Sequence, residues 1–236
     1  MTGLTTEQLQ HYNNKGYISP LSALAPKEAK EIRDEIENIE KNWPGALKGI
    51  NRNYIHLISP LFNKVCLNKN ILDAVESIIG ENILICGTTL FIKEPNEKGF
   101  VSFHQDAKYI GLEPHNWVTA WVAITDSNEI NGCMRMMPGS HKDKLKYHEQ
   151  KFDENNLLTR GQTIKNISLD KTDPIILKAG EMSLHHPTTV HGSGLNYSED
   201  RRIGFVIQSY IGTDVNQVIG KMLSLIHISE PTRRYS

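Results

Sequence analysis

Two histidines and one aspartate carry the clearest chemical signal in this chain. His104 and Asp106 flank Gln105, and His191 follows much later in the sequence. Residues two apart in an extended strand point to the same face, so we expect His104 and Asp106 to share one ion while Gln105 faces elsewhere. Two imidazoles and one carboxylate can occupy one face of a ferrous ion and leave the opposite positions open. The pattern therefore predicts a 2-His-1-carboxylate site.

Arg202 is the next candidate, because it follows His191 after a turn-rich stretch. A guanidinium is planar and permanently charged, and it can bind a carboxylate through two parallel hydrogen bonds. A dicarboxylate co-substrate would suit this residue. A site with His104, Asp106, His191 and Arg202 would then bind both a metal ion and an organic anion.

Longer segments surround these residues, and they occur in the order FHQD, VTAWVAITD, NGCMRMMPGSH and HGSGLNYSEDRR. A lone His-x-Asp triplet arises often by chance, so the argument rests on the order and spacing of all four segments. Together they resemble the phytanoyl-CoA dioxygenase family of iron(II)- and 2-oxoglutarate-dependent oxygenases. The resemblance covers most of the chain from about Leu84 to Gly220. It implies a dioxygenase that uses iron(II), 2-oxoglutarate as co-substrate, and O2.

The resemblance also implies roles for single residues. By position, His104, Asp106 and His191 would be the iron ligands and the catalytic centre. Arg202, and not the adjacent Arg201, would hold the distal carboxylate of 2-oxoglutarate.

Two further residues match positions that lie near 2-oxoglutarate in the family. They are Trp121, the aromatic residue on the strand after the His-x-Asp turn, and Ser193, the hydroxyl two residues past the second histidine. Related halogenating enzymes carry a small residue at the position of Asp106. The carboxylate here therefore implies hydroxylation and not halogenation.

The expected reaction is hydroxylation of an unactivated C–H bond in a small polar metabolite, with release of succinate and CO2. The segments GLEP, LLTRGQ and MSLHH resemble bacterial members that hydroxylate such metabolites, including 2-aminoethylphosphonate dioxygenases. One alternative is an acyl-CoA hydroxylase of the same family, although no feature of the chain identifies an adenine or pantetheine site. Another is a non-catalytic jelly-roll binding protein, which the complete set of three metal ligands disfavours.

The elements that must position these residues are helices first and short strands afterwards. Apolar residues recur at helical spacing over 26–42, and shorter helices are expected over 5–16 and 71–79. From Ile83 onward, β-type runs such as DPIILK alternate with turns. This order predicts a β-sandwich or barrel covered by helices on one side. The resemblance narrows it to a mainly β, cupin-like double-stranded β-helix, or jelly roll, with N-terminal helices packed on one sheet.

Several other residues and segments border the predicted site. The polar stretch 142–171 is expected to form a loop over it. Lys93 and Thr88 could face the pocket, although a solvated lysine at a strand end is the commoner outcome. His185 and His186 are neighbours on a strand, so at most one faces the pocket, and a structural role is expected for them.

Composition limits the classes of protein and partner. The chain has 236 residues, 39% of them hydrophobic, which suits one domain over residues 1–222. A net charge of −1 offers no basic field for nucleic acid, so the expected partner is a small molecule. Three cysteines argue against a disulfide framework. Without a signal-like or membrane-spanning run we expect no membrane partner and a cytoplasmic location, and no pattern specifies an oligomeric state.

The last residues are expected to be foreign to the domain. The run from Leu223 to Arg233 resembles the translation of a common transposase sequencing adapter. Residues 223–236 are therefore interpreted as a non-native tail, with the natural protein continuing past Met222. A native C-terminal strand is the alternative.

Overall fold

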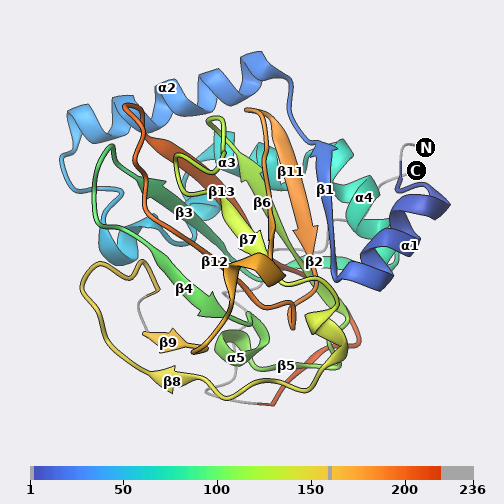
Figure 1. The fold of residues 1–236 in the computed structure, drawn as a ribbon. Helices are drawn as coiled ribbons and strands as arrows, with labels where there is room; N and C mark the ends of the chain where they lie inside the picture. The colour runs from blue at the N-terminus through green and yellow to red at the C-terminus, as the bar shows by residue number, and fades with distance from the viewer. Residues whose placement is uncertain (1–2, 159–160, 219–236) are drawn as a thin grey trace.

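Two antiparallel sheets face each other, and helices cover the outer face of the larger one (Figure 1). The computed structural model describes residues 3–158 and 161–218, so the proposed tail at 223–236 lies outside the described residues. This is the expected jelly roll with N-terminal helices. None of the helices in the described ranges is long and apolar enough to cross a membrane.

The helices are α1 (Thr6–Lys15), α2 (Pro26–Asn42), α3 (Pro60–Cys66), α4 (Lys69–Ile79) and α5 (Ala107–Ile110), with 3-10 turns η1 (Gly49–Arg52), η2 (Ile55–Leu57), η3 (Ser140–Lys142) and η4 (Leu169–Lys171). The strands are β1 (Tyr17–Ser22), β2 (Ile83–Ile85), β3 (Thr88–Lys93), β4 (Val101–His104), β5 (Leu112–Glu113), β6 (Trp117–Ala123), β7 (Met134–Met136), β8 (Glu149–Gln150), β9 (Gln162–Thr163), β10 (Asp173–Pro174), β11 (Glu181–His185), β12 (His191–Ser193), β13 (Arg202–Gly212) and β14 (Asn216–Gln217).

Local sequence signals explain where the first helices begin and end. Thr5 and Gln8 form a capping box, in which the Gln8 amide donates to the Thr5 hydroxyl at 3.2 Å and the Thr5 amide donates to the Gln8 side chain at 2.9 Å. Gly16 ends α1 with a φ of +84°, which favours glycine. Pro26 is the first residue of α2, and the fixed φ of proline suits a first helical turn. These predicted helices are confirmed.

The larger sheet has the order β1-β11-β6-β13-β2, and β3 also pairs with β13. The smaller sheet has the order β10-β7-β12-β4. In it, His191 on β12 is the register partner of His104 on β4. Residues far apart in the sequence are therefore brought together by one antiparallel pair.

Side-chain alternation on the larger sheet separates the core from the cavity between the sheets. On β6, Val118, Ala120 and Val122 join the apolar cluster shared with the helices. Thr119 and Trp121 point to the opposite face, as the two-residue period of a strand requires. The residues that can meet a ligand are thus the inward set of each strand.

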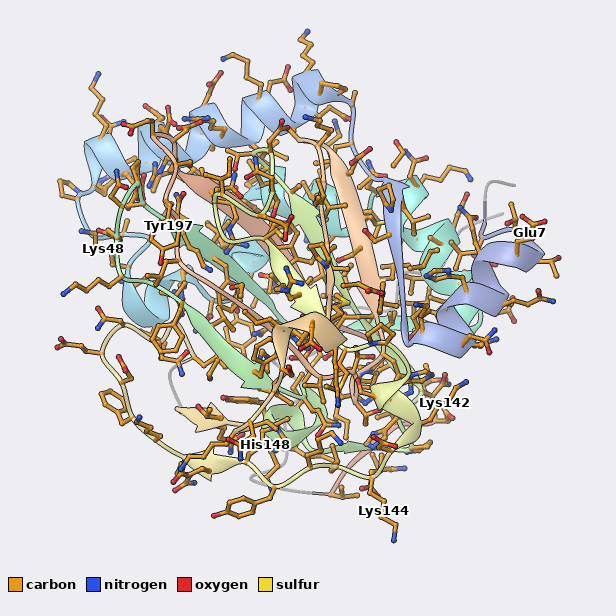
Figure 2. All side chains as sticks on the ribbon, in the orientation of Figure 1. Glu7, Lys48, Lys142, Lys144, His148 and Tyr197 are labelled. Atoms are coloured by element: carbon orange, nitrogen blue, oxygen red, sulfur yellow. The ribbon has the colours of Figure 1, made fainter. Side chains whose placement is uncertain are left out.

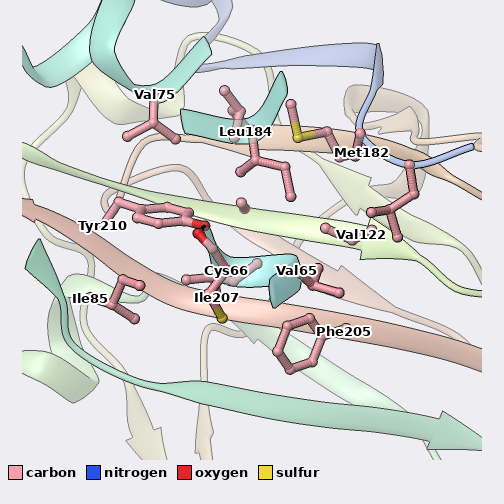
Figure 3. Packing of buried hydrophobic residues seen from close by; sticks show 14 of the residues in the cluster. Val65, Cys66, Val75, Ile85, Val122, Met182, Leu184, Phe205, Ile207 and Tyr210 are labelled. Carbon is pink, nitrogen blue, oxygen red and sulfur yellow. Dashed lines mark hydrogen bonds between the residues drawn. The ribbon is translucent and has the colours of Figure 1, made fainter. Parts of the chain in front are cut away.

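The helix layer is tied to the central strand β13 by packing and by one buried hydrogen bond (Figure 3). The Phe62 and Phe205 rings pack with centroids 5.0 Å apart. The Tyr210 hydroxyl donates to the Cys66 carbonyl at 2.7 Å, which satisfies a polar group inside the core. All three cysteines are buried free thiols, in agreement with the expectation.

Some elements differ from the prediction. The run DPIILK forms a paired strand only at Asp173–Pro174, with one isolated bridge from Leu177 to Ser127, because it lies at an edge of the small sheet and leaves it. Strand β1 was not predicted, since it is short and contains a proline. Helix α4 begins at Lys69, ahead of the expected start, because Asn68 caps it by accepting a hydrogen bond from the Asn70 amide at 2.9 Å.

The buried face of α2 gives a direct stability prediction. Ile36 is fully buried against the sheet, so Ile36→Ala should cost about 2–5 kcal/mol of unfolding free energy. Lys27→Ala on the solvated face of the same helix should change it by less than about 0.5 kcal/mol. Urea unfolding followed by circular dichroism measures both, and equal effects would contradict the assignment of the two faces.

Candidate metal centre

Three side chains meet where the small sheet ends. The Asp106 Oδ1 atom lies 3.3 Å from His104 Nε2 and 3.6 Å from His191 Nε2. One ligand atom from each residue lies within 4.8 Å of the other two. This is the trio expected from the sequence, and the described residues contain no other such group of three.

Backbone carbonyls fix the orientation of both imidazoles. His104 Nδ1 lies 2.8 Å from the Ser102 carbonyl, and His191 Nδ1 lies 2.9 Å from the Thr189 carbonyl. A carbonyl can only accept, so each Nδ1 carries the proton and each Nε2 presents its lone pair to the cluster. Burial is the largest cause that lowers the pKa of His191 well below its usual range, which keeps this ring neutral. Neutral imidazoles with a fixed second nitrogen are the form that binds a metal ion.

The carboxylate reaches the cluster by a different route from the one expected. Strand β4 ends at His104, and Asp106 has helical dihedrals (φ −58°, ψ −36°) immediately before α5. The prediction that His104 and Asp106 share a face of one strand is therefore wrong. The turn after β4, and not strand alternation, directs the Asp106 side chain toward the histidines. Gln105 does face elsewhere: its side chain donates to the Thr188 carbonyl at 2.7 Å and accepts from the Lys146 amide at 2.8 Å.

The second oxygen of Asp106 is already engaged by two groups of the larger sheet. Thr119 Oγ1 donates to Oδ2 at 2.8 Å, and His185 Nε2 lies 3.1 Å from the same atom. Burial would raise the pKa of Asp106, but the surrounding polar groups of His191, His104 and His185 outweigh it and hold the pKa well below its usual range. The carboxylate is therefore ionised, with Oδ1 directed at the imidazoles.

His185 is a site residue whose role the sequence did not reveal. Its side chain is buried and lines the cavity, whereas His186 points away and packs against His141 with ring centroids 5.4 Å apart. Strand alternation did predict that at most one of the pair faces inward. The contact between His185 and Asp106 depends on the turn after β4, which is distant in the sequence. No local sequence pattern around His185 predicts this contact.

The cluster opens into a cavity of about 750 Å³ between the sheets. Trp121, Ser193 and Arg202 line it together with the three clustered residues. Arg202 is only 1% exposed, its guanidinium carbon lies 5.2 Å from the centre of the Trp121 ring, and its Nε has no partner. Burial lowers the pKa of Arg202 to about 10, so it remains a cation at neutral pH. All six residues predicted from the sequence thus border one space.

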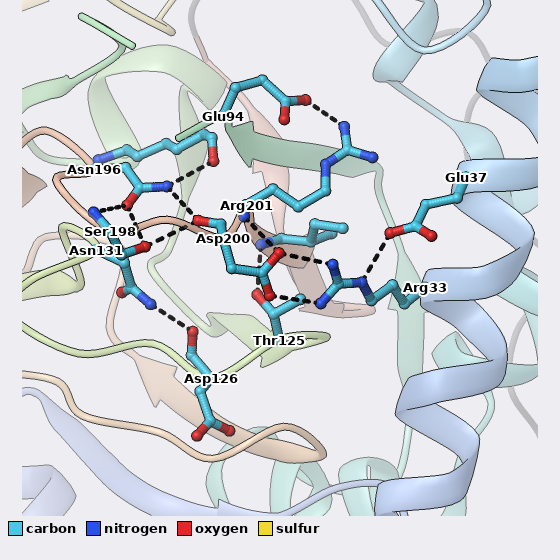
Figure 4. A network of polar contacts seen from close by, with 12 residues as sticks. Arg33, Glu37, Glu94, Thr125, Asp126, Asn131, Asn196, Ser198, Asp200 and Arg201 are labelled. Atoms are coloured by element: carbon cyan, nitrogen blue, oxygen red, sulfur yellow. Dashed lines mark hydrogen bonds and ion pairs between the residues drawn. The ribbon is translucent and has the colours of Figure 1, made fainter. Parts of the chain in front are cut away.

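Polar contacts hold Asp200 and Arg201, the two residues before Arg202, on the outer side of the sheet (Figure 4). Asp200 accepts hydrogen bonds from the Arg33 guanidinium of α2 at 2.7 and 2.8 Å. Arg201 pairs with Glu40 at 2.7 Å on the outer side. Asp200 is thus bound to α2, and strand alternation then directs Arg201 outward and Arg202 into the cavity. The resemblance had assigned the inner position to Arg202 and not to Arg201.

Lys93 is buried, and the expectation of a solvated lysine is wrong. It is 1% exposed, and its Nζ donates to Ser193 Oγ at 2.7 Å and contacts the Gly194 carbonyl. The segment after β12 folds over the end of β3, so Lys93 stands behind the cavity wall and holds Ser193. Thr88 also differs from the expectation, because its hydroxyl bonds to His56 at 2.8 Å and does not line the cavity.

The long polar segment lies over the cavity, as predicted. Strands β8 and β9 pair within it, and Gln150, Leu157, Leu158 and Gln162 line the cavity. Lys142 and Lys144 of the same segment project from the surface (Figure 2). The segment therefore supplies one wall of the site.

A jelly roll with two histidines and a carboxylate converging in an internal cavity defines the class of non-haem iron oxygenases. The phytanoyl-CoA dioxygenase (PhyH) family profile matches residues 12–204, and the chain belongs to this family. It is accordingly a non-haem iron, 2-oxoglutarate-dependent dioxygenase.

Individual relatives agree with this assignment. The chain is 27% identical to a probable alpha-ketoglutarate-dependent hypophosphite dioxygenase of Stutzerimonas stutzeri, over 91% of this chain and 81% of that protein. It is 27% identical to the peroxisomal phytanoyl-CoA dioxygenase of Mus musculus, over 84% of this chain and 66% of the mouse protein. A solved non-heme monooxygenase, ThoJ, superposes with a TM-score of 0.78 at 29% identity, covering 90% of this chain and 80% of its own.

The burial of Lys93 predicts how the stability of the protein depends on pH. Burial and the nearby Arg202 lower the pKa of Lys93 from its ordinary value of 10.5 to about 6. Between these two values the unfolded chain binds more protons than the folded chain, so stability should rise as pH increases from 7 to 9. The slope contributed by this group is at most about 1.4 kcal/mol per pH unit.

The measurement compares Lys93→Met with the unmodified chain in urea unfolding at pH 7 and pH 9. The variant should lose this part of the pH dependence. Identical slopes for the two proteins would show that Lys93 keeps an ordinary pKa.

Proposed function

We propose that this chain binds iron(II) through His104, Asp106 and His191 and hydroxylates a C–H bond of a small polar metabolite, with release of succinate and CO2. The convergence of the three ligand atoms at one cavity between the sheets carries this proposal. The donor set fits iron(II), since imidazole nitrogen and carboxylate oxygen both suit this ion. Bound iron supplies the oxygen activation that no protein side chain can perform.

The co-substrate 2-oxoglutarate is proposed to lie between the metal and Arg202. Arg202 is a buried cation that has no acidic partner among the described residues, and a distal carboxylate would accept hydrogen bonds from its guanidinium. The Trp121 ring forms the wall beside it, and the Ser193 hydroxyl, held by Lys93, offers a further hydrogen bond. These residues orient the co-substrate and exclude water from it.

Thr119 and His185 are proposed to keep Asp106 in one binding mode. With Oδ2 occupied by both groups, only Oδ1 faces the imidazoles. A ligand held by one oxygen leaves the other metal positions open for the co-substrate and O2. The carboxylate itself supports hydroxylation and not halogenation.

The proposed substrate class rests on cavity size and on relatives. The cavity of about 750 Å³ has the size of a small-molecule site and must hold the co-substrate as well. The name of the Stutzerimonas stutzeri relative specifies hypophosphite, a small polar anion. The mouse relative keeps an acyl-CoA hydroxylase as the alternative. A non-catalytic jelly-roll binder is disfavoured, because the ligand set is complete.

The co-substrate site is tested by anaerobic titration of the iron(II)-loaded protein with 2-oxoglutarate, followed by its visible charge-transfer band. Arg202→Met should weaken 2-oxoglutarate by about 30-fold or more, since a buried charge pair is worth roughly 2–5 kcal/mol. Arg201→Met removes an equal charge outside the cavity and should leave the affinity unchanged. An unchanged affinity in Arg202→Met refutes the assignment, and a wild-type protein without the band contradicts the co-substrate itself.

The substrate class is tested separately by succinate release in the presence of hypophosphite, aminophosphonates, amino acids and acyl-CoA thioesters. A small polar compound should stimulate release above the level without substrate. Stimulation by acyl-CoA alone would favour the alternative. Binding of 2-oxoglutarate without turnover of any compound would favour the non-catalytic reading.

A further inference from the structure

A second arginine lines the same cavity on the side of β3. Arg52 ends η1, next to Asn53, which forms an isolated bridge with Thr89. Its guanidinium carbon lies 5.1 Å from the centre of the Phe91 ring, and its Nη2 donates to the Leu157 carbonyl. The side chain is thus fixed between the edge of the larger sheet and the segment that covers the cavity.

The charge of Arg52 has no acidic partner among the residues that the structure describes. None of the described carboxylates lies within 4.0 Å of it, and its Nε is buried without a hydrogen bond. Burial lowers the pKa of this guanidinium, which shows that the charge is held against a desolvation cost. The side chain is half-buried and its Nε is buried, so the guanidinium has lost part of its hydration without gaining an acidic partner among the described residues. An anionic ligand in the cavity would supply that partner.

The rest of the cavity carries the same sign. Its charged lining consists of Arg52, Lys108 and Arg202 against the single carboxylate of Asp106, although the whole chain has a net charge of −1. Lys108 is exposed and can be solvated by water. After 2-oxoglutarate has paired with Arg202, Arg52 is the half-buried cation of the lining that remains without an acidic partner among the described residues.

We propose that Arg52 binds the anionic head group, of carboxylate or phosphonate type, of the primary substrate. A planar guanidinium offers five donors, of which the Leu157 carbonyl uses one, so an oxyanion can be bound by more than one hydrogen bond. Because Arg52 and the metal cluster line one cavity, a head group bound by Arg52 leaves the rest of a small molecule in the same cavity as the cluster. This inference rests on the proposed function and specifies its substrate as an anion.

The test measures the binding of ethylphosphonate, propionate and neutral propionamide by anaerobic calorimetry to the protein loaded with iron(II) and 2-oxoglutarate. The two anions distinguish a tetrahedral from a planar head group. At least one anion should bind the wild type, whereas propionamide should bind at least about 30-fold more weakly. Arg52→Met should weaken the anion by a similar factor and change 2-oxoglutarate affinity by less than about threefold.

Two further variants control for charge and folding. Lys48→Met removes an equal charge four residues earlier, where the side chain lies at the surface (Figure 2), and should leave anion affinity unchanged. Arg52→Lys keeps the charge without the planar fork and should give intermediate affinity, with a thermal midpoint that reports folding.

Three outcomes would overturn the inference. They are equal binding of propionamide and the anions, unchanged anion affinity in a folded Arg52→Met or Arg52→Lys variant, and a loss of 2-oxoglutarate affinity as large as the loss of anion affinity. The last would make Arg52 a co-substrate residue. Failure of the wild type to bind 2-oxoglutarate contradicts the proposed function instead, and this signal is recorded in a separate titration.

Discussion

The structure depends on one carboxylate, largely shielded from solvent, that must remain ionised between two sheets. Asp106 accepts hydrogen bonds from Thr119 on β6 and His185 on β11, and it faces His104 and His191 of the small sheet. An isolated charge in such a place would be costly, so these partners are a condition for its burial. The contacts therefore also fix how the two sheets face each other. This packing brings Nε2 of His104, Nε2 of His191 and Oδ1 of Asp106 together at one point.

The cost of shielding a charge from water also applies to the two arginines of the cavity. Arg202 lies at the inner wall over Trp121, and Arg52 lies between Phe91 and the covering segment. Both have a buried Nε without a partner, and neither is paired with a carboxylate among the described residues. Aromatic faces stabilise a guanidinium only in part. The positive charge of the cavity lining is complementary to the proposed anionic co-substrate and to the proposed anionic substrate.

The sequence predicts those features that depend on local or repeated patterns. The capping box at Thr5 and the proline at 26 define helix starts without reference to the rest of the fold. The motif blocks place His104, His191 and Arg202 on one cavity because their spacing reflects a shared strand order. Features that depend on long-range packing are not predicted. Lys93 is buried by a segment one hundred positions later, as its bond to Ser193 shows.

Asp106 combines both cases, since it lies beside His104 and His191 as the motif predicts, while the strand argument for its direction is wrong. An anaerobic crystal structure of the chain with iron(II) tests the central claim most directly. The account predicts iron bound by Nε2 of His104, Nε2 of His191 and Oδ1 of Asp106, with Oδ2 still bonded to Thr119 and His185. Iron bound by both oxygens of Asp106, or by His185 in place of His104 or His191, would contradict it.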